Sequence, residues 1–529
     1  MPADFDAIAI GAGHNALVAA NLLAQRGWSV LVLEAQPEPG GAVRSAELTE
    51  PGFTSDLFSS FYPLAVASPA IRSLELERHG LRWRRSALAL AHPQADGTCA
   101  AISADLDETA ASLERFAPGD GAAWRELYAY WRRAGGPFLD ALLRPFPPIR
   151  GGARLLRALG PGGLLRFLRF ALLPVRRLAE ERFAGDGAPW LLAGNALHTD
   201  LAPESAGSGL FGWVLCGLAQ QHGFPTPEGG AGRLTAALVD RLRTHGGRLE
   251  CSTEVTRVLV RGGAAVGVRT RDGREITAGR AVLAGTIAPV LYRELVGEEH
   301  LPARLRGDLR AFQPDSGTVK VDWSLDAPIP WTAEDARRAA TVHVADGLDD
   351  LTRTAGQIAR GLIPDRPFLV MGQYSMADPT RQPAGRETCW AYAHVPQTVK
   401  GDAGGALTGR WDAGDAAAFA ERVEAQIERR APGFRALIRA RHVFTPPALQ
   451  AANANLVGGA INQGTAQVHQ QLVFRPTPGL ARPETPIARL YLTGASAHPG
   501  GGVHGAAGAN AARAALALRI TGRVPRNVL

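Results

Sequence analysis

A glycine turn near the N-terminus constrains the fold of this chain more than any other feature. Phe5 to Ile10 is an apolar run that predicts a strand, and Gly11 to Ala16 follows at once with the pattern G-x-G-x-x-A. Small and apolar residues then recur at helical spacing from Ala16 to Gly27, and Trp28 to Leu33 predicts a second strand. Strand, glycine turn, helix and strand in this order predict a Rossmann-type unit that binds a dinucleotide.

Each residue of this turn has a physical task in binding a pyrophosphate. Gly11 permits the tight turn, Gly13 lets the backbone approach the phosphates, and a small residue at Ala16 lets the helix pack on the strand. The N-terminus of the helix, at His14 and Asn15, supplies backbone N–H groups and the positive end of the helix dipole. We expect these five residues to bind the dinucleotide. A turn that serves only to pack helix on strand is the alternative.

The residues after the second expected strand extend this site. Glu34 ends the strand, where its carboxylate can accept hydrogen bonds from ribose hydroxyls, and Ala35 stands beside it. A second glycine pair opens segment 40–45, which resembles the group of flavoproteins that includes phytoene desaturases and amine oxidases. In that group the pair lies against the FAD diphosphate, where Arg44 would add positive charge; a turn with a solvated Arg44 is the alternative. The residues of this segment expected at the cofactor are Gly40, Gly41, Ala42, Val43, Arg44 and Ser45.

The composition is that of a globular protein with more than one domain. The chain has 529 residues, of which 46% are hydrophobic and 20% charged. A net charge of +7 would suit a nucleic-acid partner. However, Lys occurs only at Lys320 and Lys400, Arg is scattered along the chain, and no nucleic-acid motif stands out. We therefore expect no nucleic acid among the partners.

Cysteine spacing and hydropathy limit the cellular setting. The four cysteines lie far apart, at Cys99, Cys216, Cys251 and Cys389, so neither a C-x-x-C site nor a disulfide framework is indicated. We expect no metal site and a reduced, cytoplasmic environment. No signal peptide precedes the first strand, and no apolar run is long enough to span a bilayer. Any membrane contact is therefore expected to be peripheral.

A second block typical of a cofactor domain begins near Gly223. A helix is expected from Leu234 to His245, followed by strands and hairpin turns up to Arg261. The last hairpin returns through Glu275 to Ala278 and leads into Ala281 to Gly285, which we expect to be a separate buried strand. The order helix, strand, β-meander and strand indicates that the N-terminal domain resumes here after an insertion.

The first insertion contains a basic amphipathic stretch. Between Pro137 and Pro174, Arg and large apolar residues recur at helical intervals. This pattern predicts a helix with one apolar face. In one interpretation the helix is a lid that packs this face on the protein and leaves Arg in solvent; in the other it lies on a membrane or at the entrance for a hydrophobic substrate.

The C-terminal segment carries a second glycine-rich turn. Leu490 to Gly494 predicts a strand, three consecutive glycines follow at 500–502, and small residues from 505 to 519 predict a helix. Consecutive glycines leave backbone N–H groups unshielded, so that a flat ligand can lie on the chain. In flavoproteins a helix N-terminus of this kind faces the flavin edge that gains negative charge on reduction.

Together these segments make the chain similar to phytoene desaturase-type FAD-dependent oxidoreductases, and within them to the branch described as pyridine nucleotide-disulfide oxidoreductase domain-containing protein 2. Ala16 replaces the third glycine of the first turn, which a small residue tolerates. No C-x-x-C is present, so disulfide reductase chemistry is disfavoured. The segments that carry the resemblance are 11–20, 40–45, 225–232, 378–381, 474–476 and 490–508.

The resemblance implies an α/β fold with an interrupted Rossmann-type FAD-binding domain. The interrupting domain would be a mixed α+β substrate-binding domain with a helical lid. The expected boundaries are 1–75, 223–300 and 469–529 for the FAD-binding domain, and 76–222 and 301–468 for the substrate-binding and lid domain. In the family the backbone at Val255 contacts the adenine. The C-terminal residues expected at FAD are Gly494, Gly501, Gly502 and Val503.

The function implied by the resemblance is a two-electron oxidation with FAD. A hydrophobic small molecule, such as a polyene or secondary metabolite, would be desaturated or dehydrogenated by giving a hydride to flavin N5. Oxygen, a quinone or another redox partner would then accept the electrons. A flavin-binding scaffold without strong catalysis, an FAD-dependent amine oxidase or isomerase, and an NAD(P)-dependent Rossmann enzyme are the alternatives. The last of these leaves the glycines at 40 and 500 without a task.

Three residues are candidates for proton transfer. His498 and His504 flank the C-terminal glycines and could titrate near neutral pH, or could simply bond loop carbonyls. Related amine oxidases place a lysine near flavin N5 through a water molecule, which suggests Lys320; a solvated lysine at a strand end is the alternative. Other polar residues in apolar contexts, without an assigned role, are Asp56, Tyr62, His198, Asp200 and Gln471.

Overall fold

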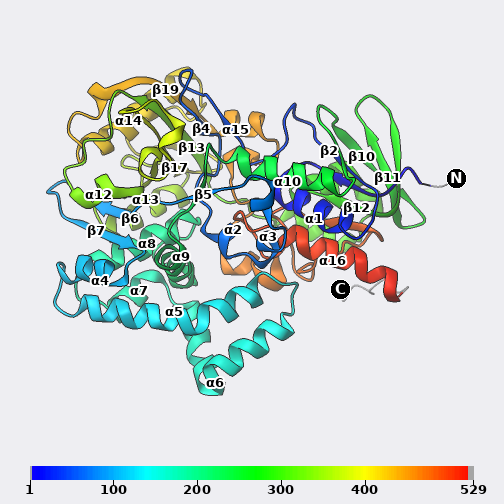
Figure 1. Cartoon of the computed structure of the whole chain (residues 1–529), viewed down its shortest axis with the longest axis horizontal. Coiled ribbons are helices and arrows are strands. Elements are labelled where there is room, and N and C mark those ends of the chain that lie inside the picture. Colours follow the sequence, from blue (N-terminus) through cyan, green and yellow to red (C-terminus); the bar gives the residue numbers. More distant parts are fainter. Residues whose placement is uncertain (1–2, 522–529) are drawn as a thin grey trace.

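Two seven-stranded sheets form the framework of the computed structural model, which describes residues 3–521 (Figure 1). In the first sheet the order is β10-β11-β12-β1-β2-β9, and β20 pairs with β12. The pairs β12–β1, β1–β2, β2–β9 and β12–β20 are parallel, as expected for a Rossmann-type sheet. Its strands are β1 (Phe5–Ile10), β2 (Val30–Leu33), β9 (Arg248–Glu250), β10 (Val255–Arg261), β11 (Ala264–Thr270), β12 (Glu275–Ala284) and β20 (Leu490–Leu492).

Three helices cover one face of this sheet. They are α1 (His14–Ala24), α10 (Gly232–Thr244) and α16 (Ala506–Thr521), and their apolar residues share one buried cluster with β1, β2 and β12. The small residues of the C-terminal segment permit very close packing, because a Cβ at Gly508 would lie only 1.8 Å from the carbonyl oxygen of Asn15. The N-termini of α1 and α16 therefore meet at one end of the sheet.

One expectation about the meander is wrong. Glu275 to Ala278 and Ala281 to Gly285 are not two strands but parts of the single strand β12. Its first residues pair antiparallel with β11, and its last residues pair parallel with β1 and β20. Gly279 and Arg280 continue the extended backbone instead of turning, so one strand belongs to both the meander and the parallel sheet.

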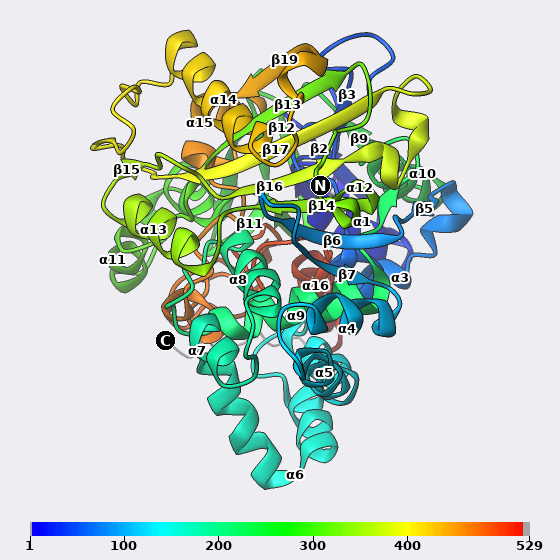
Figure 2. The same cartoon turned by 90° about the vertical axis from the view of Figure 1, so that its left-hand side faces the viewer.

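The second sheet has the order β19-β13-β17-β16-β14-β6-β7 and spreads across the upper part of Figure 2. Along β13 and β17, alternate residues such as Val321 and Ala391 pack in a buried cluster with α14 (Ala413–Glu428). The opposite face, which carries Trp390 and Tyr392, packs against α8 (Gly187–His198) and α9 (Ser208–His222). The strands are β6 (Leu88–Pro93), β7 (Cys99–Ser103), β13 (Gly317–Leu325), β14 (Ala339–Val344), β16 (Leu369–Gln373), β17 (Glu387–Val395) and β19 (Ile438–Phe444).

A helical hairpin projects from the lower end of the molecule (Figures 1 and 2). The stretch 137–174 is not one helix, because its first residues complete α5 (Asp120–Leu142) and the remainder forms α6 (Ile149–Leu172). Gly160, with a φ of 72°, kinks α6 before Pro161. Within residues 3–521 no helix is long and apolar enough to cross a membrane.

The other elements are short or connect the two sheets. The small strands β5 and β8 pair across the predicted domain boundary. The remaining strands and α-helices are β3 (Ser45–Ala46), β4 (Ser55–Asp56), β5 (Trp83–Arg84), β8 (Thr226–Pro227), β15 (Leu362–Ile363), β18 (Gly401–Asp402), α2 (Pro63–Ala67), α3 (Pro69–Arg72), α4 (Leu106–Glu114), α7 (Val175–Glu180), α11 (Ala303–Arg310), α12 (Glu334–Arg338), α13 (Leu348–Ala359) and α15 (Pro446–Ala452).

Candidate active site

A cavity of about 1730 Å³ is lined by residues of both sheets and of the helices around them. Most of the residues expected at the cofactor line it, together with two of the three catalytic candidates. The expected residues that line the cavity are Gly11, Gly13, His14, Asn15, Ala16, Glu34, Ala35, Gly41, Ala42, Arg44, Val255, Gly494, Gly501, Gly502, Val503, His504 and Lys320. Gly40, Val43, Ser45 and His498 do not line it.

The N-terminus of α1 is open toward this cavity. Gly13 is the N-cap residue, no side chain caps the helix, and its first turn contains no acidic residue. A Cβ at Gly13 would have no atom within 4 Å, so free space lies in front of the backbone. The unbonded N–H groups of the first turn and the helix dipole therefore make this end suited to an anion.

Glu34 fixes the glycine turn from the end of β2. Its Oε2 accepts a hydrogen bond from the Ala12 N–H at 2.6 Å, and its Oε1 accepts one from the Gln36 N–H at 2.9 Å. Each carboxylate oxygen retains a second lone pair for a further donor. Glu34 is therefore placed both to hold the turn and to accept a hydroxyl from a ligand.

The glycine pair at 40 and 41 lies directly against the first turn. The Gly40 N–H donates to the Ala12 carbonyl at 2.9 Å, and a Cβ at Gly41 would lie 3.0 Å from the Gly13 Cα. Both residues have positive φ, 127° and 56°, which favours glycine. Gly41 lines the cavity, whereas Gly40 supports the turn from behind.

The residues after the glycine pair mostly hold the loop in place. The Val43 carbonyl accepts the Thr235 hydroxyl at 2.7 Å, and the Ser45 hydroxyl donates to the Asp56 carboxylate at 2.7 Å. Arg44 lines the cavity and donates to the carbonyls of Gly41 at 3.2 Å and Ala452 at 2.8 Å. Arg44 is therefore not a solvated turn residue but a link between two segments of the cavity wall.

His504 caps the C-terminal helix. Its Nδ1 accepts the Ala506 N–H at 3.0 Å in the first turn of α16, and burial lowers the pKa of His504 to about 3. A neutral imidazole satisfies one of the otherwise unbonded N–H groups of the helix N-terminus. This contact favours a structural role for His504.

His498 lies outside the cavity. Its Nε2 donates to the carbonyl oxygen of Arg144 at 2.9 Å, which ties the C-terminal loop to the end of α5. Burial lowers the pKa of His498 to about 4, so its imidazole is neutral near pH 7. The contacts of His498 therefore fit hydrogen bonding to a loop carbonyl and do not fit proton transfer in the cavity.

Lys320 is buried in the middle of β13, with 3% of its surface exposed. Its Nζ donates to the Asp322 carboxylate at 2.5 Å and to the Asp56 carbonyl at 2.9 Å. Burial raises the pKa of Asp322 to about 6, while the ammonium of Lys320 opposes this shift. The alternative of a solvated lysine at a strand end is therefore wrong, and Lys320 lines the cavity.

A buried ion-pair cluster beside Lys320 joins the two parts of the molecule. Arg381 is fully buried, and its guanidinium lies 2.7 Å from the Asp56 carboxylate and 3.1 Å from that of Asp378. The Ala231 N–H donates to Asp56, and the Gly229 N–H donates to Asp378. The motifs 225–232 and 378–381 are therefore in contact through one ion-pair cluster. Their spacing in the sequence did not indicate this contact.

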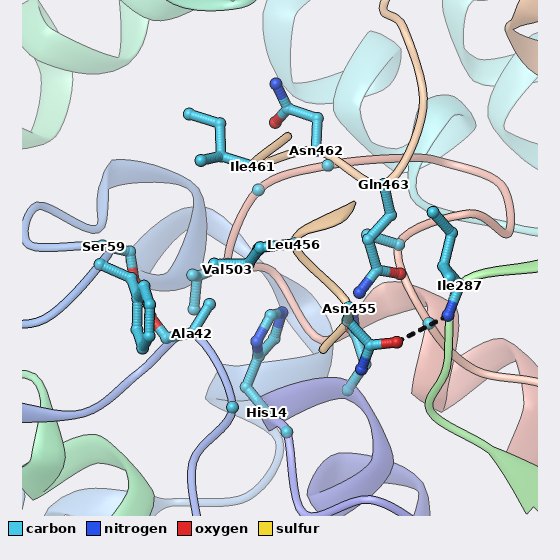
Figure 3. A pocket seen from close by; sticks show the side chains of 18 of the residues that line it. His14, Ala42, Ser59, Ile287, Asn455, Leu456, Ile461, Asn462, Gln463 and Val503 are labelled. Carbon is cyan, nitrogen blue, oxygen red and sulfur yellow. Dashed lines mark hydrogen bonds between the residues drawn. The ribbon is translucent and has the colours of Figure 1, made fainter. Parts of the chain in front are cut away.

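An amide-rich loop completes the cavity and was missed as a site segment. Figure 3 shows Asn455 beside Ile287, whose N–H donates to Asn455 Oδ1 at 2.8 Å. Asn462 reaches the C-terminal glycines, since a Cβ at Gly501 would lie 2.3 Å from Asn462 Oδ1. The buried Arg475 holds this loop by donating to the carbonyls of residues 462, 464, 465 and 495. The sequence feature that could have predicted this segment is the concentration of Asn and Gln residues between 453 and 471.

The remaining cavity walls are mainly apolar. Of the polar residues without an assigned role, Tyr62, His198 and Gln471 line the cavity, whereas Asp56 and Asp200 do not. Within residues 3–521, no group of three or more His, Cys, Asp or Glu is placed to hold a metal ion. The apolar lining from the helical side includes Phe138, Leu142, Leu143, Phe167, Leu168, Ala171, Leu172, Leu210, Phe211, Val214, Leu215 and Phe224.

The fold and the site together define an oxidoreductase that binds a dinucleotide next to an apolar cavity. The chain belongs to the flavin-containing amine oxidoreductase family, whose model matches residues 17–355. It is 29% identical to pyridine nucleotide-disulfide oxidoreductase domain-containing protein 2 of Mus musculus, over 96% of this chain and 93% of that protein. It is 25% identical to the neurosporene-forming phytoene desaturase of Cereibacter sphaeroides, over 97% of this chain and 94% of that protein.

A solved structure supports the fold. Cyclohexylamine oxidase from Brevibacterium oxydans matches with a TM-score of 0.60 and 17% identity, over 98% of this chain and 100% of that chain. The expected fold class and the resemblance to phytoene desaturase-type flavoproteins are thus confirmed. The chain is an FAD-dependent oxidoreductase. The NAD(P)-dependent alternative is excluded by the family, and the scaffold alternative is not favoured.

The residues present fit FAD. The N-terminus of α1 is uncapped and has open space in front of Gly13. His14 Nε2 and Asn15 Oδ1 are buried and have no hydrogen-bond partner within residues 3–521. Buried polar atoms without partners cost free energy, so a polar ligand at this position would satisfy them.

Proposed function

We propose that the chain uses FAD to desaturate or dehydrogenate an elongated hydrophobic small molecule. The observation that best supports this proposal is that one cavity is shared by the expected FAD residues and by a wall of aromatic and aliphatic side chains. Its volume of about 1730 Å³ exceeds the roughly 300–1,000 Å³ of common ligand pockets. A cavity of this size has room for a dinucleotide and a second ligand.

The FAD-binding residues in this proposal are those expected from the sequence. When bound, FAD supplies the hydride acceptor of the reaction. The N-terminus of α1 at Gly13 would hold the diphosphate, Glu34 the ribose, and the backbone at Val255 the adenine. The glycine-rich segment before α16, at Gly501, Gly502 and Val503, would lie along the flavin. Gly40, Val43 and Ser45 would act indirectly by supporting the glycine turn.

Lys320 is the catalytic residue that we propose, because its ammonium lines the cavity in a fixed position. The Asp322 carboxylate and the Asp56 carbonyl hold Nζ and prevent it from moving into solvent. For His504 and His498 we propose structural roles, as helix cap and loop tie. The domain boundaries expected from the sequence stand as part of this proposal. The electrons would pass on to oxygen, a quinone or another redox partner.

We further propose that the chain works in the cytoplasm and contacts a membrane surface through α6. This helix carries five Arg and no acidic residue, and within residues 3–521 Arg150, Arg157 and Arg166 form no ion pair or hydrogen bond. Leu165 and Leu172 are 70% and 61% exposed. Cationic side chains next to exposed apolar ones are typical of a helix that lies on an anionic bilayer.

Purification followed by flavin analysis tests the function. We expect a yellow protein that releases FAD in a molar ratio near one, as measured by absorbance and mass spectrometry. We also expect anaerobic bleaching of the flavin by a lipid fraction, with recovery on addition of oxygen or a quinone. A colourless protein that takes up no FAD on reconstitution would overturn the proposal.

A further inference from the structure

Helix α8 places two polar side chains on the wall of the cavity. Asn195 and His198 are three residues apart and therefore lie on the same side of the helix. Both line the cavity. The rest of α8 is dominated by apolar residues buried in the core. Two polar groups at one point of such a wall are typical of a site that orients a ligand.

The imidazole of His198 has no hydrogen-bond partner within residues 3–521. It is held instead by an edge-on ring contact, with its centroid 5.8 Å from that of Tyr392 and an angle of 65° between the ring planes. Burial, followed by the nearby His394, lowers the pKa of His198 to about 4. The ring is therefore neutral near pH 7 and offers one N–H donor and one acceptor nitrogen.

Asn195, one helical turn earlier on the same side of α8, offers an acceptor. Its Nδ2 donates to the Leu191 carbonyl at 2.9 Å and lies 3.3 Å from Cys216 Sγ. These contacts fix the orientation of the amide and leave Oδ1 without a donor among the described residues. Asn195 is 1% exposed overall and lines the cavity.

Two charged groups that could compete for this pair, Asp200 and Lys320, are already bonded to other residues. Asp200, two residues beyond His198, does not line the cavity, because its carboxylate accepts from the Ser316 and Thr465 hydroxyls. The ammonium of Lys320, which also lines the cavity, is paired with the Asp322 carboxylate. Tyr392, whose ring contacts that of His198, also lines the cavity, and its hydroxyl is buried without a hydrogen-bond partner among the described residues. Val214, Phe224 and Trp390 line the same cavity and are apolar or aromatic. The local chemistry therefore suits a neutral polar group and neither a carboxylate nor an amine.

We propose that the substrate is an alcohol with a long apolar body, and that its hydroxyl group is bound by His198 and Asn195. A hydroxyl group can donate to Asn195 Oδ1 and accept from the His198 N–H at the same time. A carbonyl group only accepts and would leave Asn195 without a partner, and a hydrocarbon would leave both residues unsatisfied. This inference rests on the proposed function and assigns the substrate class of the same cavity.

A matched pair of probes tests the inference on the purified, FAD-loaded protein. Binding of phytol and of the hydrocarbon phytane is measured in the same detergent by quenching of tryptophan fluorescence. We expect phytol to bind at least about tenfold more tightly, the effect of one or two hydrogen bonds. Equal affinity for the two probes would overturn the inference.

Variants identify the residue responsible. His198→Phe keeps the ring volume and should reduce the phytol preference to within about twofold by removing the donor. His198→Gln keeps a donor and an acceptor and should retain part of it. The control is His469→Phe, which changes a cavity-lining imidazole that already donates to Gln313 at 3.0 Å, and it should keep the preference. If His198→Phe weakens both probes equally, His198 only shapes the cavity and the inference fails.

The FAD content of each sample separates this inference from the proposed function. A sample that carries FAD but shows no preference for phytol contradicts only the assignment of an alcohol. A sample that binds no FAD contradicts the proposed function itself. Melting temperature and FAD content together show whether each variant is folded.

Discussion

Lys320 and Asp322 form a buried ion pair on the cavity face of β13, with Nζ 2.5 Å from Oδ1 and side chains that are 4% and 0% exposed. Residues at i and i+2 of a strand share one face, which places the two groups side by side. The pair lies one strand away from Tyr392 and Trp390, since Lys320 is opposite Tyr392 and Asp322 is opposite Trp390. The only lysine of the substrate-side sheet is thus fixed within the cavity wall.

Breaking this pair should destabilise the protein strongly. Asp322→Leu leaves an unpaired ammonium in the core and Lys320→Met leaves an unpaired carboxylate, and each should cost about 3–5 kcal/mol of unfolding free energy. The double variant Lys320→Met with Asp322→Leu should cost less than either single change, because no unpaired charge remains. Urea unfolding of the three variants measures this. Additive losses in the double variant would show that the two groups are not coupled.

Gly13 should be required for FAD but not for folding. Its φ of −69° and ψ of 160° suit a β-branched residue, and a Cβ there meets no protein atom within 4 Å. Gly13→Val should therefore leave the melting temperature of the apoprotein nearly unchanged. The side chain would fill the space in front of the helix N-terminus and weaken FAD binding at least about tenfold.

A control for this change is Gly152→Val on α6, where a Cβ also meets nothing within 4 Å. FAD affinity, measured by titration of the apoprotein, should be unchanged in this variant. Equal FAD affinity in the Gly13 variant and the native protein would contradict the assignment of the diphosphate to α1.

The contrast between the glycine turn and Lys320 shows what the sequence could predict. The turn at Gly11 and Gly13, the strand before it and Glu34 are near one another in sequence, so local patterns define the whole unit. The burial of Lys320 depends instead on how distant strands pair. Its burial follows from the position of β13 inside a sheet whose other strands come from 88–103 and 339–444. A strand pattern alone does not tell an edge strand from an inner one.

The ion-pair cluster at Arg381 and the loop at Asn455 also could not be predicted from local sequence patterns. Arg381 bonds to Asp56, 325 positions earlier, and Asn455 bonds to Ile287, 168 positions earlier. No spacing rule connects such residues. For His504, the glycines around it suggested chemistry, whereas the three-dimensional start of α16 gives it a capping role. The continuous strand β12 was missed because Gly279 suggests a break, although an extended backbone accepts glycine.

Acid should destabilise the protein through its buried histidines. The folded-state pKa of His498 is lowered to about 4 by burial, whereas an unfolded histidine has a pKa of about 6.5. Between these values the unfolded state binds a proton and the folded state does not. Stability is therefore unaffected above about pH 6.5 and falls toward about pH 4, by up to about 1.4 kcal/mol per pH unit for each such histidine.

His498→Gln isolates one of these groups, since the glutamine amide can still donate to the Arg144 carbonyl. Unfolding free energies of this variant and the native protein, measured from pH 7.5 to pH 5, should diverge as the pH falls. The slope of the variant should be shallower by up to about 1.4 kcal/mol per pH unit. Parallel curves would show that His498 is accessible to protons in the folded state.

Binding to anionic membranes should depend on both the Leu and the Arg residues of α6. Leu168 and Leu172 line the cavity and are 52% and 61% exposed. Val468, on the neighbouring loop, approaches the same helix end, because a Cβ at Gly207 would lie 2.9 Å from Val468 Cγ1 and 3.6 Å from the Ala171 carbonyl. The apolar surface of α6 therefore continues into the cavity, and a bilayer seated there could deliver an apolar substrate directly.

The double variant Leu165→Ser with Leu168→Ser should lower the affinity for phosphatidylglycerol vesicles at least about tenfold, because burial of a Leu side chain in lipid contributes about 1.5–3 kcal/mol. Arg157→Glu with Arg166→Glu should lower it similarly at low salt and less at high salt, since exposed charges are screened. Co-sedimentation measures both effects. The control is Arg243→Glu on α10, an exposed charge on the other part of the molecule, which should bind as the native protein does. If native protein does not co-sediment with anionic vesicles, or if the control loses binding as the α6 variants do, α6 is not the membrane contact.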